Sequence, residues 1–379
     1  MIRFIGNEIY RRSHLGRSHP LSIPRVSSCI DLSRLLGWLG QASYVECQAA
    51  TREALLRFHR ADYIEVLQRV EAGERLTPEE KRRYNIGVNG NPLYAEIFSR
   101  PATSCGATLL ATQLVRGGGV VYSPAGGTHH GRPAQASGFC YLNDIVLGLH
   151  ALLDNGFTRI VYVDLDAHHG DGVQDAFAAN SRIRLISIHE HARWPNTGSI
   201  DDDGGGNAFN IPVPQGFHDD EMALVMEEAV LPLVTSFAPE ALVIQGGADA
   251  LADDPLSKLA LSNNALWAAV GMLKGTAPRM IVLGGGGYNP WSVARCWTGI
   301  WGVITDRSIP DRLPLEAENY LRTLTWRRSA GRNPPAHWFT TLRDEPRLGP
   351  IREDVRLAVR AIATRHHANR VDVRVKGAA

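Results

Sequence analysis

RIVYVDLDAHHGDG, residues 159–172, contains a short apolar run that passes directly into a cluster of ionisable side chains. The apolar half is rich in β-branched residues and does not alternate with polar positions, which predicts a strand buried on both faces. Four other runs share this character and end in glycine or polar residues: 120–127, 183–190, 241–249 and 279–289. Strands of this kind are typical of a parallel sheet that is covered by helices.

Helical patterns separate these runs. Apolar residues from Ile145 to Leu153 follow helical spacing, and Asn155-Gly156 ends that segment. Val173 with Phe177, and the stretch 222–234, indicate two further helices. Strands that alternate with helices predict a wound α/β sheet, in which ligands bind beyond the carboxyl ends of the strands. The polar clusters that follow four of the predicted strands should therefore form one composite site.

Composition places limits on the class of protein. The chain has 379 residues, of which 44% are hydrophobic and 21% charged, and its net charge is +1. This near-neutral charge gives no general attraction to nucleic acid or to an anionic membrane. The five cysteines are scattered without a CxxC pair, which favours a reducing cytoplasm over a disulfide framework. We see no signal peptide, and no apolar run approaches the roughly 20 residues needed to span a bilayer.

The two ends of the chain differ from its middle. Residues 1–80 are expected to be largely helical, and the chain becomes rich in Arg and Pro after about residue 310. We predict a catalytic domain over residues 1–325 and a peripheral C-terminal extension over residues 326–379. The DDDGGG run at 201–206 is interpreted as a solvated loop. The pair His366-His367, which has only basic neighbours, is interpreted as surface.

The cluster after the 159–164 run carries the strongest chemical signal. Asp166 and His168 are two residues apart, so an extended backbone places both side chains on one face. Asp249, after another predicted strand, offers a third ligand. Three protein ligands leave one position of a metal ion open for water, as in catalytic zinc sites. The alternative is a set of hydrogen-bonded polar groups that cap strands, but five ionisable groups in eight residues exceed that need.

Such a metal site also requires a base and an electrophilic partner. The tandem His129-His130 can supply the base, and Asp164 and Asp171 are spare carboxylates that could orient the two imidazoles. Tyr288, which follows four glycines, can donate its hydroxyl to a developing oxyanion. GGGGY alone could also bind phosphate, but it lacks the GxGxxG order and the GK[ST] of a P-loop.

Several long motifs resemble the zinc-dependent histone deacetylase family. They are, in chain order, HHGRPAQASGFCYLND, VYVDLDAHHGDGVQDAF, ISIH, QGGAD and LGGGGYNPWSVARCWT. HPLSIPRVS, LLRFHRADYIEVL and DPLSKLALSNNAL resemble its bacterial acetoin-utilisation-type branch, which is close to the class I enzymes. The resemblance spans roughly residues 5–325. It implies a single-domain arginase/deacetylase fold, with a central, mainly parallel eight-stranded sheet flanked by helices, and a deacetylase that hydrolyses acetyl-lysine or a related acylated amine.

The resemblance also implies roles for individual residues. Zinc would be held by Asp166, His168 and Asp249, with Fe(II) or Co(II) as alternatives for this oxygen-rich set. His130 would act as the general base beside Asp171, and His129 as an electrostatic or acid partner beside Asp164. Tyr288 would polarise the acyl carbonyl. The residues implied to line the acyl-lysine tunnel are Gly138, Phe139, Trp194, Leu256 and Gly286. A structural potassium site would involve Asp164, Asp166, His168, Ser187 and Ile188, and Arg25 would match an arginine of an interior channel.

Two positions depart from the family pattern. Class I members carry a carboxylate on a rim loop that grips the substrate backbone, whereas Asn89 or Gly90 stands here. Trp194 replaces the usual phenylalanine and would narrow the tunnel. Polyamine-specific members place a glutamate where Leu256 stands, which argues against cationic polyamines.

Other functions remain open from the sequence. An acetylpolyamine or other small-molecule amidohydrolase, a dinuclear-manganese ureohydrolase and a non-catalytic acyl-lysine binding module are the alternatives. The ureohydrolase would need a second carboxylate two residues after His168, where Gly170 stands. The oligomeric state and the acyl chain are not specified by any motif.

Overall fold

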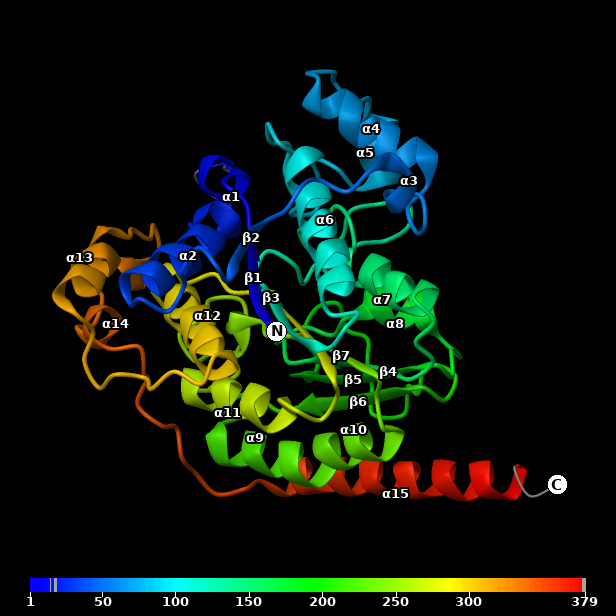
Figure 1. Cartoon of the computed structure of the whole chain (residues 1–379). Coiled ribbons are helices and arrows are strands. Elements are labelled where there is room, and N and C mark those ends of the chain that lie inside the picture. Colours follow the sequence, from blue (N-terminus) through cyan, green and yellow to red (C-terminus); the bar gives the residue numbers. More distant parts are fainter. Residues whose placement is uncertain (14, 17–18, 377–379) are drawn as a thin grey trace.

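The apolar run at 159–164 forms β4 (Ile160–Asp164), an interior strand of an eight-stranded sheet (Figure 1). The computed structural model describes residues 1–13, 15–16 and 19–376, with side chains up to residue 368. The strand order is β2-β1-β3-β8-β7-β4-β5-β6, and every neighbouring pair is parallel. The other strands are β1 (Ile2–Gly6), β2 (Tyr44–Glu46), β3 (Gly119–Ser123), β5 (Ile183–Glu190), β6 (Ala208–Val213), β7 (Ala241–Gln245) and β8 (Arg279–Leu283).

Helices cover both faces of this sheet. Those that precede β4 are α1 (Ile9–Arg12), α2 (Val26–Leu35), α3 (Arg52–Leu55), α4 (Ala61–Glu71), α5 (Pro78–Tyr84), α6 (Ser99–Leu114) and α7 (Asp144–Asp154). Those that follow it are α8 (Asp171–Phe177), α9 (Asp219–Val225), α10 (Leu231–Phe237), α11 (Asn263–Leu273), α12 (Pro290–Ile304), α13 (Leu315–Thr323), α14 (His337–Thr340) and α15 (Glu353–Lys376). None of the described helices is long and apolar enough to cross a membrane.

The sheet is buried on both sides, as its uninterrupted apolar runs predict. Within β4, Val161 and Val163 belong to one hydrophobic core together with residues of α2 and of α9 to α12. Ile160 and Tyr162 belong to a second core, which contains residues of α6, α7 and α8. Successive side chains of a strand point to opposite faces, so one short strand contributes to two cores. This confirms the predicted helix–sheet–helix layering.

The register of the strands places the polar clusters at one edge of the sheet. Asp164, the last residue of β4, lies opposite Ser187 of β5 and Gln245 of β7, and Gln245 lies opposite Leu283 at the end of β8. The segments that leave these ends carry the predicted ligands and the four glycines. Parallel pairing therefore brings together residues that are more than 100 positions apart in the chain.

The expectation of a largely helical first segment is wrong in part. β1 lies inside the sheet between β2 and β3, and β2 forms one of its edges. β2 is only three residues long, and Arg3 interrupts the apolar residues of β1, so neither strand gives a continuous apolar run. β6, which also lacked a sequence signal, contains Pro212 and forms the other edge of the sheet, where proline is tolerated.

The chain after residue 326 packs onto the rest of the molecule. Trp338, Phe339 and Leu342 lie in the same core as α11 and α12. The fully buried Arg295 of α12 donates from Nε to the carbonyl of Thr341 over 2.8 Å. The predicted boundary at residue 325 remains a prediction, because this packing does not show where a catalytic domain ends.

The interpretation of His366-His367 as surface is wrong for its first member. His366 is 6% exposed, and its ring lies 6.4 Å from that of Phe209 in β6. α15 lies along this edge of the sheet (Figure 1), so one face of the helix is covered. His367 is exposed. The DDDGGG run forms a turn, as expected, in which Asp202 accepts a hydrogen bond from Gln174.

The α11–α12 interface depends on a glycine that has no room for a side chain. A Cβ at Gly299 would lie 2.0 Å from the indole of Trp267, whereas a Cβ at Gly271 would meet nothing closer than 3.5 Å. We expect Gly299→Ala to lower the free energy of unfolding by about 1–3 kcal/mol, because the buried indole must move. Gly271→Ala should leave it unchanged or raise it by up to about 1 kcal/mol, through helix propensity. Urea denaturation of both variants measures this, and equal effects would contradict the packing argument.

Candidate active site

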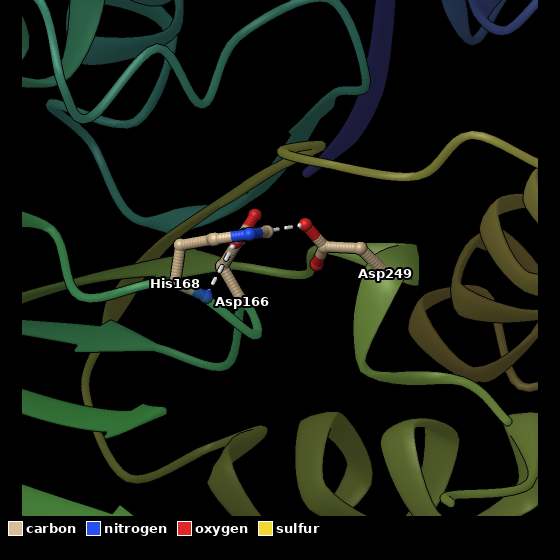
Figure 2. Close-up of side chains that lie close together, drawn as sticks. All are labelled: Asp166, His168 and Asp249. Carbon is tan, nitrogen blue, oxygen red and sulfur yellow. Dashed lines mark hydrogen bonds and ion pairs between the residues drawn. The ribbon is translucent and has the colours of Figure 1, made fainter. Parts of the chain in front are cut away.

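Three predicted metal ligands converge beyond the carboxyl ends of β4 and β7 (Figure 2). Asp166 and His168 follow β4, and Asp249 lies in a turn that follows β7. All three side chains are buried, and one ligand atom from each lies within 4.8 Å of the others. His168 Nδ1 is 3.2 Å from Asp166 Oδ1 and 3.0 Å from Asp249 Oδ2. Among the residues that the structure describes, they form the one cluster with metal-ligand geometry.

These spacings fit a divalent metal ion. Ligand atoms about 2.0–2.1 Å from a tetrahedral ion stand about 3.3 Å from one another, close to the observed separations. The two carboxylates also need a positive partner. Burial opposes protonation of His168, but its hydrogen bonds to Asp166 and Asp249 hold its pKa well above the ordinary value. A cation at this position would satisfy the same two carboxylates.

Glycines allow the backbone to approach the carboxylates. A Cβ at Gly247 would lie 2.3 Å from Asp166 Oδ2, and a Cβ at Gly286 would lie 2.0 Å from Asp249 Oδ2. The Gly286 N–H instead donates to Asp166 Oδ2 over 2.7 Å, and the Gln245 amide donates to the same oxygen over 3.0 Å. These donors hold the Asp166 carboxylate in one orientation.

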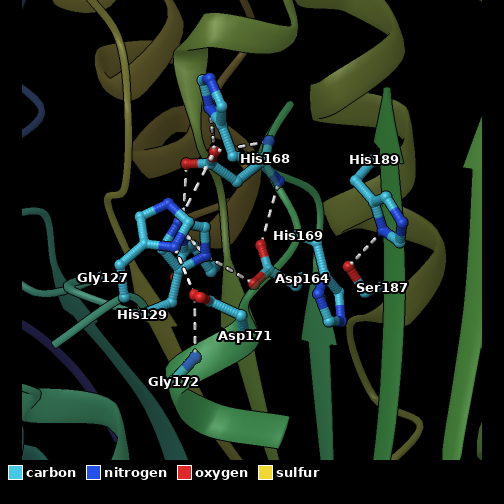
Figure 3. A network of polar contacts seen from close by, with 12 residues as sticks. Gly127, His129, Asp164, His168, His169, Asp171, Gly172, Ser187 and His189 are labelled. Carbon is cyan, nitrogen blue, oxygen red and sulfur yellow. Dashed lines mark hydrogen bonds and ion pairs between the residues drawn. The ribbon is translucent and has the colours of Figure 1, made fainter. Parts of the chain in front are cut away.

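The tandem histidines are each paired with a different aspartate, and Figure 3 labels His129, Asp164 and Asp171. His129 Nδ1 is 2.8 Å from Asp164 Oδ2, and His130 Nδ1 is 2.7 Å from Asp171 Oδ1. A carboxylate can only accept here, so each Nδ1 carries a proton. The two rings lie 3.8 Å apart between centroids. The predicted pairing of each histidine with its own carboxylate is the arrangement that the structure has.

The environment separates the two imidazoles electrostatically. Burial opposes protonation of His129, but the charges of Asp164 and Asp166 outweigh it and raise the pKa of His129 to about 9. Burial and the positive charge of His129 lower the pKa of His130 to about 3. At neutral pH, His129 is therefore cationic while His130 is neutral and able to accept a proton.

An open pocket of about 710 Å³ leads to this group. Its described lining is Asn85, Asn89, Gly90, His130, Ser137, Gly138, Phe139, His168, Arg193, Trp194, Leu256 and Tyr288. Four of the five predicted tunnel residues are among them. A Cβ at Gly138 would lie 2.5 Å from the Trp194 ring, so the glycine and the indole face each other closely.

The fifth predicted tunnel residue, Gly286, lies deeper. It lines a smaller cavity of about 50 Å³, which it shares with Arg25, His129 and Tyr288. Arg25 is partly buried there, where its guanidinium donates to the Gly285 carbonyl over 2.6 Å and lies 5.3 Å from the Trp297 ring centroid. Tyr288 lines both cavities and therefore stands where they meet.

Asp254 is a site residue that the sequence reasoning missed. It is buried, and its Oδ2 accepts a hydrogen bond of 2.7 Å from the backbone N–H of Tyr288. Its Oδ1 accepts from the N–H of Leu256 over 2.9 Å, so one carboxylate fixes both the tyrosine and a wall of the pocket. Burial and the neighbouring Asp249 raise the pKa of Asp254. The adjacent carboxylates Asp253-Asp254 before Pro255 were the available signal.

The residues implied for potassium lie at the end of β4, just after it, and in the neighbouring strand β5. Asp164 of β4 stands opposite Ser187 of β5, and Ile188 follows in the same strand. Ser187 Oγ is 2.9 Å from His189 Nδ1 (Figure 3).

On the rim of the pocket, Asn89 donates from Nδ2 to Asn85 Oδ1 over 2.9 Å. Two amide side chains thus stand on this part of the rim.

Comparisons with known proteins agree with this geometry. The family model of the histone deacetylase domain matches residues 19–304. Histone deacetylase 8 of Xenopus tropicalis is 34% identical over 302 residues, which cover 77% of this chain and 81% of the frog protein. A Caenorhabditis elegans protein described as histone deacetylase 2 is 33% identical over 354 residues, or 91% of this chain. The chain spans 66% of the length of that worm relative.

A solved structure is similar over nearly the whole fold. The crystal structure of a histone deacetylase homologue from Aquifex aeolicus superimposes with a TM-score of 0.90 at 33% identity, covering 96% of this chain and 99% of that one. A homologue of this kind complexed with SAHA gives the same values. The eight-stranded parallel sheet, the matched domain and the buried Asp-His-Asp site all agree, and the chain therefore belongs to the histone deacetylase family of metal-dependent deacetylases.

Proposed function

We propose that this protein hydrolyses the amide bond of acetyl-lysine, or of a related acylated amine, at the site formed by Asp166, His168 and Asp249. The observation that carries the proposal is one pocket with three functional elements at its base. His168 of the metal-ligand cluster, the neutral His130 and Tyr288 all line the open pocket, and the cationic His129 and Asp166 line the smaller cavity, which shares those three residues.

The three ligands fit zinc, and the same donors would also accept Fe(II) or Co(II). A bound ion of this kind supplies Lewis acidity that polarises a carbonyl and makes water more acidic. Family resemblance adds a structural potassium ion at Asp164, Asp166, His168, Ser187 and Ile188, next to the catalytic group. The five free, buried cysteines support a cytoplasmic location.

The chain's own residues account for the proton transfers. His130 is neutral and accepts a proton from the attacking water at Nε2, while Asp171 fixes its tautomer. Tyr288 donates its hydroxyl to the carbonyl oxygen as negative charge develops there, and burial keeps that hydroxyl protonated by raising its pKa. The C–N bond then breaks as a histidine returns a proton to the leaving amine, which yields a carboxylate and a free amine.

The alternatives are less well supported by the site. A ureohydrolase needs ligands for two ions, and the described residues form one three-ligand cluster. A polyamine deacetylase would need a carboxylate at the mouth, where Leu256 stands. A non-catalytic acyl-lysine binding module would not require a histidine pair whose members differ in protonation.

Metal analysis tests the ligand set. We expect the purified protein to bind about one divalent ion per chain, and His168→Gln to lose most of that ion together with deacetylation, because one of three ligands is removed. His169→Gln is the matched control, since His169 hydrogen-bonds to Thr197 and Gln174 instead. Two ions per chain would support the ureohydrolase, and retention of the ion by His168→Gln would remove His168 from the ligand set.

Tyr288→Phe tests the oxyanion donor. Loss of one such donor costs about 3 kcal/mol in the barrier, so kcat on an acetyl-lysine peptide should fall by about 100-fold. The metal content and the free energy of unfolding should not change, because the ring and its contact with Phe139 remain. Undiminished kcat would refute this role.

The pH dependence tests the histidine pair. His130 should remain neutral throughout the physiological range, so activity should not fall between pH 8 and pH 6. Activity should fall above about pH 9, where His129 loses its proton. Asp164→Asn removes the main charge that raises this pKa, so the alkaline fall should move to lower pH. The control Asp175→Asn changes an exposed carboxylate near the site and should leave the kcat/KM profile in place. An unmoved alkaline limb in Asp164→Asn would argue against this assignment.

A further inference from the structure

The mouth of the pocket carries a cation that the proposed reaction does not use. Apart from His130 and His168 at the base, Arg193 is the one ionisable lining residue besides Tyr288 among those described, and no carboxylate lines the space. Arg193 lies beside Trp194, whose ring forms a wall of the pocket and is 44% exposed. The described lining of the pocket thus presents one guanidinium and no carboxylate.

Arg193 is held in place from behind by a buried carboxylate. Its Nε donates to Glu190 Oε2 over 2.8 Å, and its Nη2 donates to Glu190 Oε1 over 2.6 Å. Glu190 ends β5 and also accepts from the backbone N–H of Lys258 over 2.8 Å. The Glu190 side chain is 1% exposed and that of Arg193 is 26% exposed. The pair is thus ordered so that its anionic half faces the interior and its cationic half faces the pocket.

This arrangement leaves hydrogen-bond donors of the guanidinium available. A guanidinium has five N–H donors in a planar fork, and the bidentate contact with Glu190 uses two of them. Nη1 makes no contact with a protein acceptor among the described residues. An arginine with its orientation already fixed loses little entropy when it binds a second carboxylate.

We infer that Arg193 binds a carboxylate at the solvent-facing end of the substrate, so that the preferred substrates are acylated amines that carry a negative charge there. This inference rests on the proposed function. The charge can come from the carboxylate of an acylated amino acid itself or from an acidic side chain beside an acylated lysine. Cationic acylated amines would meet an unfavourable charge at the same position.

Matched substrates test the inference on the metal-loaded enzyme. Nα-blocked Nε-acetyl-lysine with a free carboxylate is compared with its carboxamide, and peptides with Asp beside acetyl-lysine are compared with Asn peptides. We expect about fivefold higher kcat/KM for the anionic member of at least one pair, the magnitude of a partly exposed ion pair. The pair that shows the preference identifies the source of the carboxylate. The preference should shrink as ionic strength rises.

Variants assign the preference to Arg193. Arg193→Gln alone would leave Glu190 buried without its partner and could unfold the protein, so the double variant Glu190→Gln/Arg193→Gln is the test and should abolish the preference. Glu190→Gln alone keeps the guanidinium without its neutralising carboxylate and should increase the preference. Arg57→Gln changes an exposed arginine paired with Asp154 and should have no effect.

The outcomes separate the inference from the proposed function. Equal kcat/KM within both pairs, or a preference that survives in the double variant, would overturn the role of Arg193 while deacetylation stands. If no substrate is turned over, the proposed function fails. Calorimetric measurement of the binding of the same compounds then tests the role of Arg193. Tighter binding of the free acid than of the amide, lost in the double variant, would still support Arg193, whereas equal binding would overturn it.

Discussion

Buried carboxylates at the carboxyl edge of the sheet are the constraint on which the rest of this structure depends. Asp164, Asp166, Asp171, Asp249 and Asp254 are all buried there. A buried charge without a partner is strongly unfavourable, so each carboxylate must be matched by a proton, a cation or several hydrogen bonds. Asp164 and Asp171 are matched by the two histidines, and Asp254 by two backbone N–H groups. Asp166 and Asp249 share His168 and leave the place that a metal ion would fill.

The same constraint explains the division of roles between the histidines. Two adjacent imidazoles cannot both be protonated easily when they are buried next to each other. The one with more negative charge nearby keeps its proton, and its charge then lowers the pKa of the other. His129 has the charges of Asp164 and Asp166 nearby and is therefore cationic. His130 has mainly that of Asp171 and is therefore the neutral base. In the proposed reaction Tyr288 supplies a donor, and the glycine turn brings the backbone close to the carboxylates.

The base of the pocket and its rim are built from different parts of the fold. The base contains the motifs that place the chain in its family, and its geometry follows from the ends of parallel strands. The rim is formed by loops, where Asn85, Asn89 and Arg193 stand around the entrance. A loop can change these residues without disturbing the sheet, so the substrate that the site accepts can change while the reaction remains the same.

The sequence by itself determined five of the interior strands, the Asp166-His168-Asp249 cluster and the histidine pair. In these segments the deciding signals are local in the sequence. They are continuous β-branched runs, and the pair Asp166 and His168, which lie two residues apart just after one strand. The tertiary structure alone decided features that need partners distant in sequence. Strands β1, β2 and β6 are too short or too mixed to be recognised without the strands that they pair with. His366 is buried only because α15 packs on β6, Asp254 acts only through Tyr288, and Arg193 faces the pocket only because Glu190 is buried behind it.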